Sequence, residues 1–117
     1  MAEYKFKGEG APEFEHGGGL VLVHLTEYRS AGPEYRTAVK LFDDEGPYAS
    51  FSINVTEAPI HDGEFVVNHD VTRDKALMKT ALNSGLFTDT KLRVNYGMVK
   101  DAPIWELNRE KWKKVRV

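Results

Sequence analysis

Alternation of apolar and polar residues predicts that several short segments of this chain are β-strands. Residues 3–7 alternate two aromatic residues with two lysines, and residues 35–42 alternate in a similar way. A compact apolar run at residues 20–26 is too short for an ordinary helix and is also predicted to be a strand. Because successive side chains of a strand point to opposite faces, these segments suit a sheet with one face on a core.

The clearest alternation, in residues 48–55, predicts which side chains face the core. Its apolar residues are expected inside, and the polar residues between them are expected on the exposed face: Ser50, Ser52 and Asn54. The acidic segment at residues 43–47 contains a glycine and a proline and is predicted to close a hairpin. Residues 20–26, 35–42 and 48–55 are therefore predicted to form an antiparallel meander.

One segment has helical periodicity. Apolar residues within 73–84 recur at helical spacing and form one stripe. Asp70 or Thr72 is expected to cap the start of this helix, and Gly85 stands where a glycine commonly ends one. Residues 64–68 are expected to form a short extended piece, and further strands are predicted at residues 92–96 and 104–107. The pattern predicts an α+β fold, with an antiparallel sheet of about five or six strands and one helix packed on one face.

Two segments lack a clear period. Residues 8–19 are rich in glycine and contain one large apolar residue, so they are predicted to form a flexible loop. Residues 109–117 form a basic tail, which is expected to be either a short amphipathic helix or a frayed end. Exposed edges on the first or last strand would allow self-association, and the pattern leaves the oligomeric state open.

The composition is that of an ordinary globular domain. The 117 residues suit a single domain, and 41% hydrophobic and 29% charged residues are far from the composition of disordered chains. The absence of cysteine excludes disulfides, thiolate nucleophiles and cysteine-based metal sites. The chain contains no apolar run long enough to span a bilayer and no signal-peptide pattern. We therefore expect a cytoplasmic protein that works away from membranes.

No pattern indicates catalysis or metal binding. The His-Asp dipeptides at residues 61–62 and 69–70 contain metal-ligand residue types, but their spacing matches no metal motif and suits turns or helix caps. The serines at residues 50–52 are predicted on a sheet face, with no histidine placed to activate them. The triple glycine at residues 17–19 precedes a strand, whereas a phosphate-binding loop follows one. We expect a protein that is not an enzyme and that uses no cofactor or metal.

Four segments resemble the pattern of a known family. Residues 46–55, with Gly-Pro-Tyr-Ala and then Ser-Ile-Asn-Val, look like a GEPYA…TVNL core. Residues 58–67, 82–92 and 97–104 look like the segments that follow it. The pattern resembles that of small uncharacterised proteins encoded on phages, plasmids and other mobile elements of bacteria. The resemblance covers residues 20–107, about three-quarters of the chain.

The resemblance implies one compact domain of mobile-element origin, and it implies no established activity. The sequence departs from the family pattern at two places. Lys91-Leu92 stands where the family often has Gly-Arg, and the basic tail looks additional.

The charges are unevenly distributed along the chain. Residues 1–64 hold 5 basic and 12 acidic side chains, giving −7, whereas residues 65–117 hold 11 basic and 6 acidic, giving +5. Such polarity either steers a charged partner or is neutralised where the two halves pack together.

Acidic residues of the first half fall mainly in predicted loops and turns, which would place them together at one end of the sheet. Clustered carboxylates can contact the Lys and Arg side chains with which a host protein otherwise holds phosphates. We therefore expect a non-catalytic protein that binds and inhibits a host protein or complex, for example an anti-defence protein of the anti-CRISPR kind. Ordinary loop solvation is the simpler explanation. The expected contact residues are Asp43, Asp44, Glu45, Glu27 and Glu34.

The basic tail suggests an alternative, a nucleic-acid-binding accessory protein. Its residues combine positive charge with an aromatic ring, as in proteins that hold phosphates and stack on bases. The residues concerned are Arg109, Lys111, Trp112, Lys113 and Lys114. The net charge of −2 argues against this alternative, because nucleic-acid-binding domains are usually clearly basic. A solvated tail is the simpler explanation.

Overall fold

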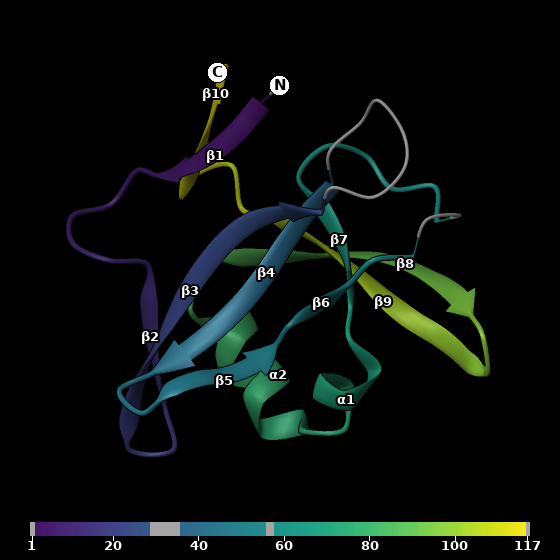
Figure 1. Ribbon diagram of the computed structural model, residues 1–117, viewed down its shortest axis with the longest axis horizontal. Coiled ribbons are helices and arrows are strands. Elements are labelled where there is room, and N and C mark those ends of the chain that lie inside the picture. Colours follow the sequence, from purple (N-terminus) through teal and green to yellow (C-terminus); the bar gives the residue numbers. More distant parts are fainter. Residues whose placement is uncertain (1, 29–35, 56–57, 117) are drawn as a thin grey trace.

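The computed structural model describes residues 2–28, 36–55 and 58–116 (Figure 1). These residues form ten strands in three antiparallel sheets, together with two helices. The predicted α+β class with antiparallel strands is confirmed, but the prediction of a single sheet is wrong. Neither of the two described helices is long and apolar enough to cross a membrane.

The first sheet contains the predicted meander. Its strands, in spatial order, are β2 (Glu13–His16), β3 (Gly19–Tyr28), β4 (Arg36–Asp43) and β5 (Gly46–Ser50). Strands β3 and β4 match the predicted segments 20–26 and 35–42. The predicted strand 48–55 is wrong as a single strand, because β5 ends at Ser50 and residues 52–53 form β6 in another sheet. In contrast, β2 lies within the segment that was predicted to be a flexible loop.

A tight hairpin joins β2 to β3. Gly17 and Gly18 have φ angles of 62° and 83°, and His16 pairs with Gly19 across the turn. Positive φ at both central residues is typical of a type I′ turn, whose twist suits a hairpin and which glycine adopts without steric cost. The prediction of a loop over residues 8–19 is therefore wrong for this part of the segment, because these glycines make a turn between paired strands.

The chain changes sheet at Phe51. Its N–H donates to the Val39 carbonyl at 3.0 Å, within the first sheet, and its carbonyl accepts from Asn68 N at 2.9 Å, in the second. Ser52 is 3% exposed, and its hydroxyl oxygen accepts a hydrogen bond from Val39 N at 2.8 Å. The prediction that Ser52 lies on an exposed face is wrong because the change of sheet interrupts the alternation.

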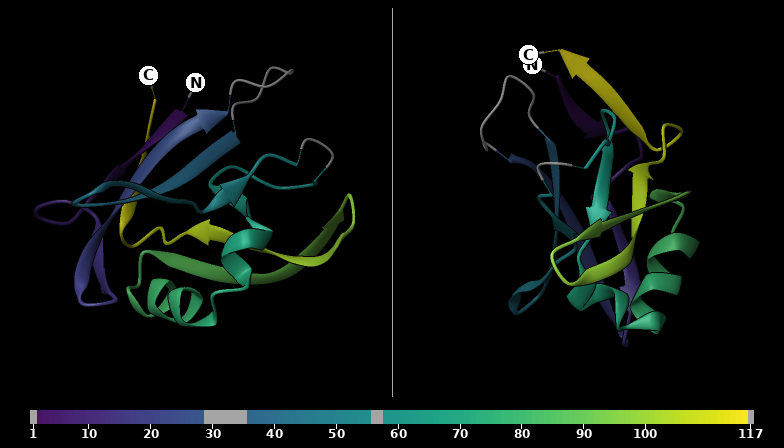
Figure 2. Two further views of the ribbon diagram at one scale, coloured as in Figure 1. Left: turned by 60° about the horizontal axis from the view of Figure 1, so that its bottom comes forward. Right: turned by 90° about the vertical axis from the view of Figure 1, so that its right-hand side faces the viewer.

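The second sheet has the order β6-β7-β9-β8. Its strands are β6 (Ser52–Ile53), β7 (Glu64–Val67), β8 (Phe87–Tyr96) and β9 (Val99–Leu107). β8 begins five residues before the strand predicted at residues 92–96, and its pairing with β9 is shifted between Asp89 and Leu92. The β8–β9 hairpin extends away from the rest of the molecule (Figures 1 and 2).

Two helices connect β7 to β8, namely α1 (His69–Thr72) and α2 (Lys75–Asn83). Asp74 caps α2, since its carboxylate accepts from Leu77 N at 3.0 Å. The predicted caps, Asp70 and Thr72, instead lie within α1. Gly85 follows α2 with a φ of 78°, as expected for a glycine after a helix end.

The ends of the chain form a third, two-stranded sheet. β1 (Ala2–Phe6) pairs antiparallel with β10 (Trp112–Arg116), so the two ends lie side by side (Figure 2). Both predictions for the tail, a helix and a frayed end, are wrong. Trp112 is 3% exposed, contacts the ring of Phe6 at 5.4 Å between centroids, and donates its indole N–H to the Leu86 carbonyl at 3.0 Å.

The main core joins residues from both four-stranded sheets, both helices and β10. Four aromatic rings stand at its centre, and their contacting pairs lie 5.4 to 6.1 Å apart. These rings belong to Phe51, Phe65, Phe87 and Trp105. This packing fixes the outward faces of the first sheet and of the β1–β10 ribbon.

Candidate interaction surfaces

The outward face of the first sheet has a row of large apolar side chains in solvent. Leu20 and Leu22 of β3 are 52% and 38% exposed, whereas Val21 and Val23 between and beyond them are buried. Phe42 of β4 pairs directly opposite Leu22 and is partly exposed. Neighbouring exposed apolar residues are more informative than scattered ones, because a monomer gains nothing from leaving them in water.

Carboxylates border this apolar row on β2. Glu13 and Glu15 are exposed and stand directly opposite Leu22 and Leu20 in the β2–β3 register. Phe14 between them is buried, so both glutamates lie on the same face as the leucines. Residues 8–19 were predicted to form a loop, so the sequence pattern could not show that these glutamates flank an apolar row.

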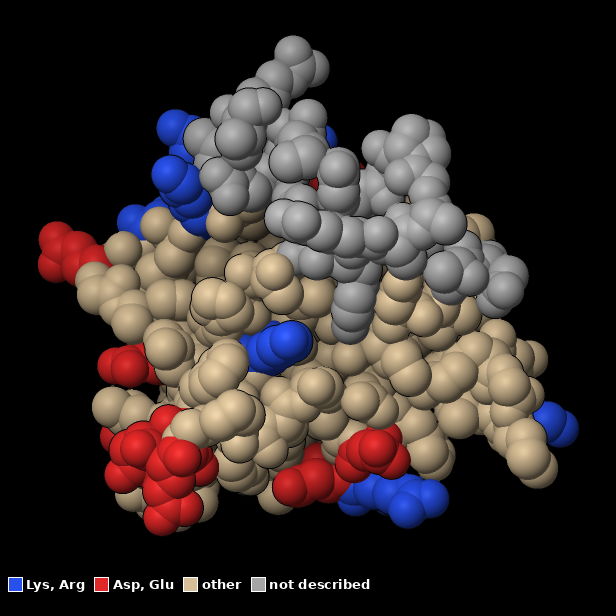
Figure 3. Space-filling view, viewed as in Figure 1, with Lys and Arg blue, Asp and Glu red and all other residues tan. Residues whose placement is uncertain are grey.

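The β4–β5 turn adds three more acidic residues at one end of the face. Asp43 accepts a hydrogen bond from Glu45 N at 2.9 Å through its carboxylate, while Asp44 and Glu45 are exposed. Acidic side chains gather at the lower left of the space-filling view, at the end of the sheet where this turn lies (Figure 3). We define the acidic face as Glu13, Glu15, Leu20, Leu22, Phe42, Asp43, Asp44 and Glu45.

The other two residues predicted to join this cluster are not part of it. Glu27 lies near the far end of β3, where it pairs with Thr37. It stands five residues from Leu22, the partner of Phe42, which corresponds to about 17 Å along a strand. The prediction that Glu27 gathers with Asp43 is therefore wrong. Glu34 lies outside the described residues.

The basic residues of the tail divide into two groups. Lys114 forms an ion pair with Asp62, and Arg109 donates to the Asp62 carbonyl at 2.8 Å and lies 5.0 Å from the Tyr4 ring centroid. Lys111 and Lys113 are exposed. Trp112 is a core residue, so it presents no ring on which a base could stack.

Lys5 of β1 and Lys7, which follows the end of β1, join Lys111 and Lys113. Lys5 pairs directly opposite Lys113, and Lys7 N donates to the Lys111 carbonyl at 2.9 Å. Phe6 and Trp112 face the core, so the lysines on either side of them point away from it. We define the lysine face as Lys5, Lys7, Lys111 and Lys113. The alternation in residues 3–7 indicated the outward lysines, but only the pairing of the two ends shows that the four come together.

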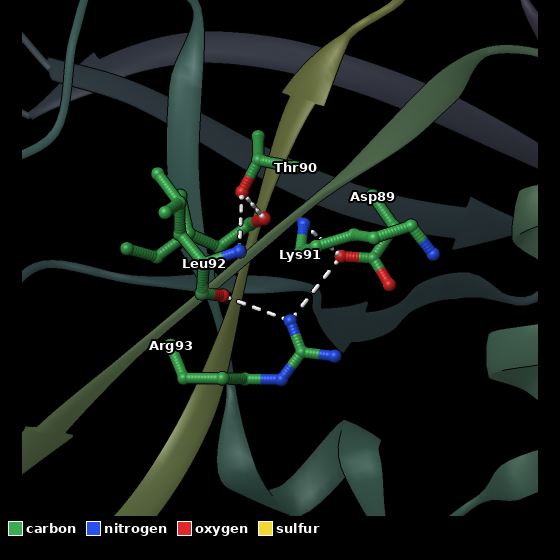
Figure 4. A network of polar contacts seen from close by, with 6 residues as sticks. Asp89, Thr90, Lys91, Leu92 and Arg93 are labelled. Atoms are coloured by element: carbon green, nitrogen blue, oxygen red, sulfur yellow. Dashed lines mark hydrogen bonds and ion pairs between the residues drawn. The ribbon is translucent and has the colours of Figure 1, made fainter.

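The β8 bulge is a third unusual feature, and the alternation pattern did not predict it (Figure 4). Lys91 has a φ of 68° and donates its N–H to the Asp89 carboxylate at 2.8 Å. Thr90 donates its hydroxyl to the Ile104 carbonyl at 2.5 Å and accepts from Leu92 N at 3.1 Å. These contacts satisfy the backbone at the bulge, so they explain its shape without a ligand.

The histidine-aspartate pairs do not converge. Among the described residues, no group of three or more His, Asp or Glu side chains is placed to hold a metal ion. Asp62 is paired with Lys114, and Asp70 lies in the first turn of α1. Ser50 is exposed, while Ser52 is bound to the backbone of β4.

Comparisons with protein-family models, with curated proteins and with solved structures found no match to this chain. The resemblance to mobile-element proteins thus stays a prediction.

Proposed function

We propose that this protein is a non-catalytic inhibitor that binds a host protein or complex through its acidic face. The single observation that supports this function is the row formed by Leu20, Leu22 and Phe42, bordered by carboxylates of β2 and of the β4–β5 turn. Interfaces commonly combine an apolar centre with a polar rim, and this face has both.

The charge of the face indicates the chemistry of the partner. Carboxylates around an apolar row match a protein surface on which Lys and Arg side chains surround an apolar patch. Nucleic-acid-binding sites supply such cations, and a partner held there would lose access to its phosphate ligand. The resemblance to mobile-element proteins is consistent with a host protein in the cytoplasm as the target.

The first test identifies the partner and the effect of binding on it. Tagged protein is used to capture host proteins from a nuclease-treated lysate, and the captured protein is purified and titrated with untagged protein. We expect a stoichiometric complex in which the partner loses its nucleic-acid-dependent activity. A complex with full activity would contradict inhibition.

The second test locates the interface. Asp44 and Glu45 are exposed, and a variant with Asp44→Lys and Glu45→Lys leaves Asp43 to hold the turn. We expect binding to weaken at least about tenfold, because like charges would then face each other across the interface. The matched control, Asp70→Lys with Glu110→Lys, changes two exposed residues elsewhere by the same charge.

Leu22→Ser tests the apolar part of the same face. An exposed side chain contributes little to folding, so the free energy of unfolding is expected to change by only about 0.5 kcal/mol. Binding should nevertheless weaken at least about tenfold if Leu22 is buried by the partner. Wild-type affinity in both the Leu22 variant and the charge-reversal variant would show that the partner binds elsewhere.

A further inference from the structure

The lysine face gathers four like charges on one side of the β1–β10 ribbon, a separate surface from the acidic face. Lys5 and Lys113 stand directly opposite each other, and Lys7 and Lys111 continue the arrangement. Like charges directly opposite on neighbouring strands destabilise the pair. The fold thus brings together positive charges that repel one another.

Among the side chains that the structure describes, no carboxylate forms an ion pair with any of these four lysines. The two ion pairs found there are Arg93 with Asp89 and Lys114 with Asp62. The ammonium group of Lys7 donates to the Arg109 carbonyl at 3.0 Å, which leaves its charge unbalanced. Asp62, the carboxylate paired with the ribbon, is already engaged by Lys114.

We propose that the lysine face binds the phosphate backbone of nucleic acid without reading its sequence. Two residues along a strand span about 6.6 Å and neighbouring strands lie about 4.8 Å apart, so the lysines form two short rows of charge. Lysine meets a phosphate as a point charge and releases condensed counterions when it does so. A row of successive phosphates can contact several such charges at once, so the phosphate backbone is the expected ligand.

The position of Trp112 limits how this surface recognises its ligand. Binding of single strands commonly depends on bases stacked on exposed aromatic rings, and this ring is buried under the ribbon. The lysine face therefore contacts backbone and not bases, which favours a duplex. This site differs from the predicted tail site, because Lys5 and Lys7 near the start of the chain supply half of its charges and the tail supplies no stacking ring.

The inference is independent of the proposed inhibitor function, because the two surfaces share no residue. A variant of the acidic face should bind nucleic acid at least as well as wild type, since it removes negative charge. A variant of the lysine face should still bind the protein partner. Each proposal can thus fail without the other.

The test is binding of fluorescent DNA and RNA duplexes of about 20 base pairs, by anisotropy, between about 50 and 200 mM salt. We expect weak binding, with a Kd on the order of 10⁻⁴–10⁻⁶ M at physiological salt, and similar affinity for unrelated sequences. The slope of log K against log salt should be roughly −3.6, or about −0.9 for each of four phosphate contacts.

Substitution of the central pair distinguishes this site from general attraction. Lys5→Gln with Lys113→Gln should reduce the magnitude of the slope by about 1.8, because two phosphate contacts are lost. The matched control, Lys75→Gln with Lys79→Gln, removes the same charge from exposed positions of α2 and should leave the slope unchanged. Equal losses in both variants would overturn the proposal, as would no binding at low salt.

Sedimentation of the same variants tests a different role for the lysines. Charged side chains on edge strands often prevent strand pairing between copies. If the Lys5 and Lys113 variant self-associates but binds duplexes as wild type does, the lysines protect the ribbon edges and the proposed site is wrong. A monomeric variant with a reduced salt slope supports it.

Discussion

Tyr4 shows how one side chain links the ribbon to the body of the molecule. Its hydroxyl is buried, and its ring lies against Arg109. Burial raises the pKa of Tyr4 above 10.0; the negative charge of Asp62 raises it further, and Arg109 acts in the opposite direction. The folded state therefore favours the neutral phenol.

This pKa predicts a loss of stability in alkaline solution. Above the unfolded-state pKa of 10.0 the unfolded chain releases the Tyr4 proton while the folded chain retains it. The contribution of Tyr4 to the free energy of unfolding is therefore fully present below pH 10, and it is lost as the pH rises through the folded-state pKa. Urea unfolding between about pH 8 and pH 11 should show this fall.

Tyr4→Phe is the matched variant for this measurement. It should remove the part of the alkaline loss that Tyr4 causes, so its stability should fall less steeply above pH 10. At pH 8 its stability should lie within about 1.5 kcal/mol of wild type, because a single hydrogen bond of a hydroxyl contributes no more than about that much. Parallel pH curves for the two proteins would contradict the explanation.

At the scale of elements, the β8 bulge contains a correctable strain. Lys91 has a φ of 68°, which glycine adopts freely and other residues adopt at a cost. We expect Lys91→Gly to raise the free energy of unfolding by about 0.5–1 kcal/mol, measured by urea denaturation.

The control for this prediction is Lys100→Gly in β9. Lys100 is exposed and, unlike Lys91, does not have positive φ. Glycine there should destabilise the strand by roughly 0.5–1 kcal/mol, because it adds only freedom to the unfolded chain. Destabilisation by both substitutions would mean that the Lys91 side chain stabilises the fold by more than its positive φ destabilises it.

The elements that sequence predicted well are those whose pairing is local. The apolar run in residues 20–26, the alternation in residues 35–42 and the acidic turn between β4 and β5 were sufficient to predict the pairing of β3, β4 and β5. Alternation failed at Ser52, because pairing with β7 turned this hydroxyl toward Val39. The glycines of the β2–β3 turn did contain a hairpin signal, since two adjacent glycines suit a type I′ turn.

At the scale of the whole molecule, the largest error concerned Trp112. In sequence it stands among basic residues, and its partner Phe6 lies more than a hundred positions away. No local pattern could show that this ring completes the core. The same long-range pairing creates the lysine face, whereas the acidic turn was predictable because its carboxylates are neighbours in sequence.

This placement predicts that the tail supports the whole fold. Trp112→Ala should lower the free energy of unfolding by about 3–5 kcal/mol, as expected for truncation of a large buried aromatic residue. Lys113→Ala, one residue further along and exposed, should change it by only about 0.5 kcal/mol. Thermal or urea unfolding compares the two, and equal small effects would contradict a core role for Trp112.

The β1–β10 pairing has a consequence for synthesis on the ribosome. β1 is the first described element to leave the exit tunnel and β10 is the last. β1 therefore remains unpaired while the elements between them are synthesised. Chain elongation proceeds at roughly 5–20 residues per second, so this wait lasts seconds, long compared with the formation of a local hairpin. The meander can form during translation, whereas the ribbon, and with it the lysine face, forms only after translation has passed Trp112.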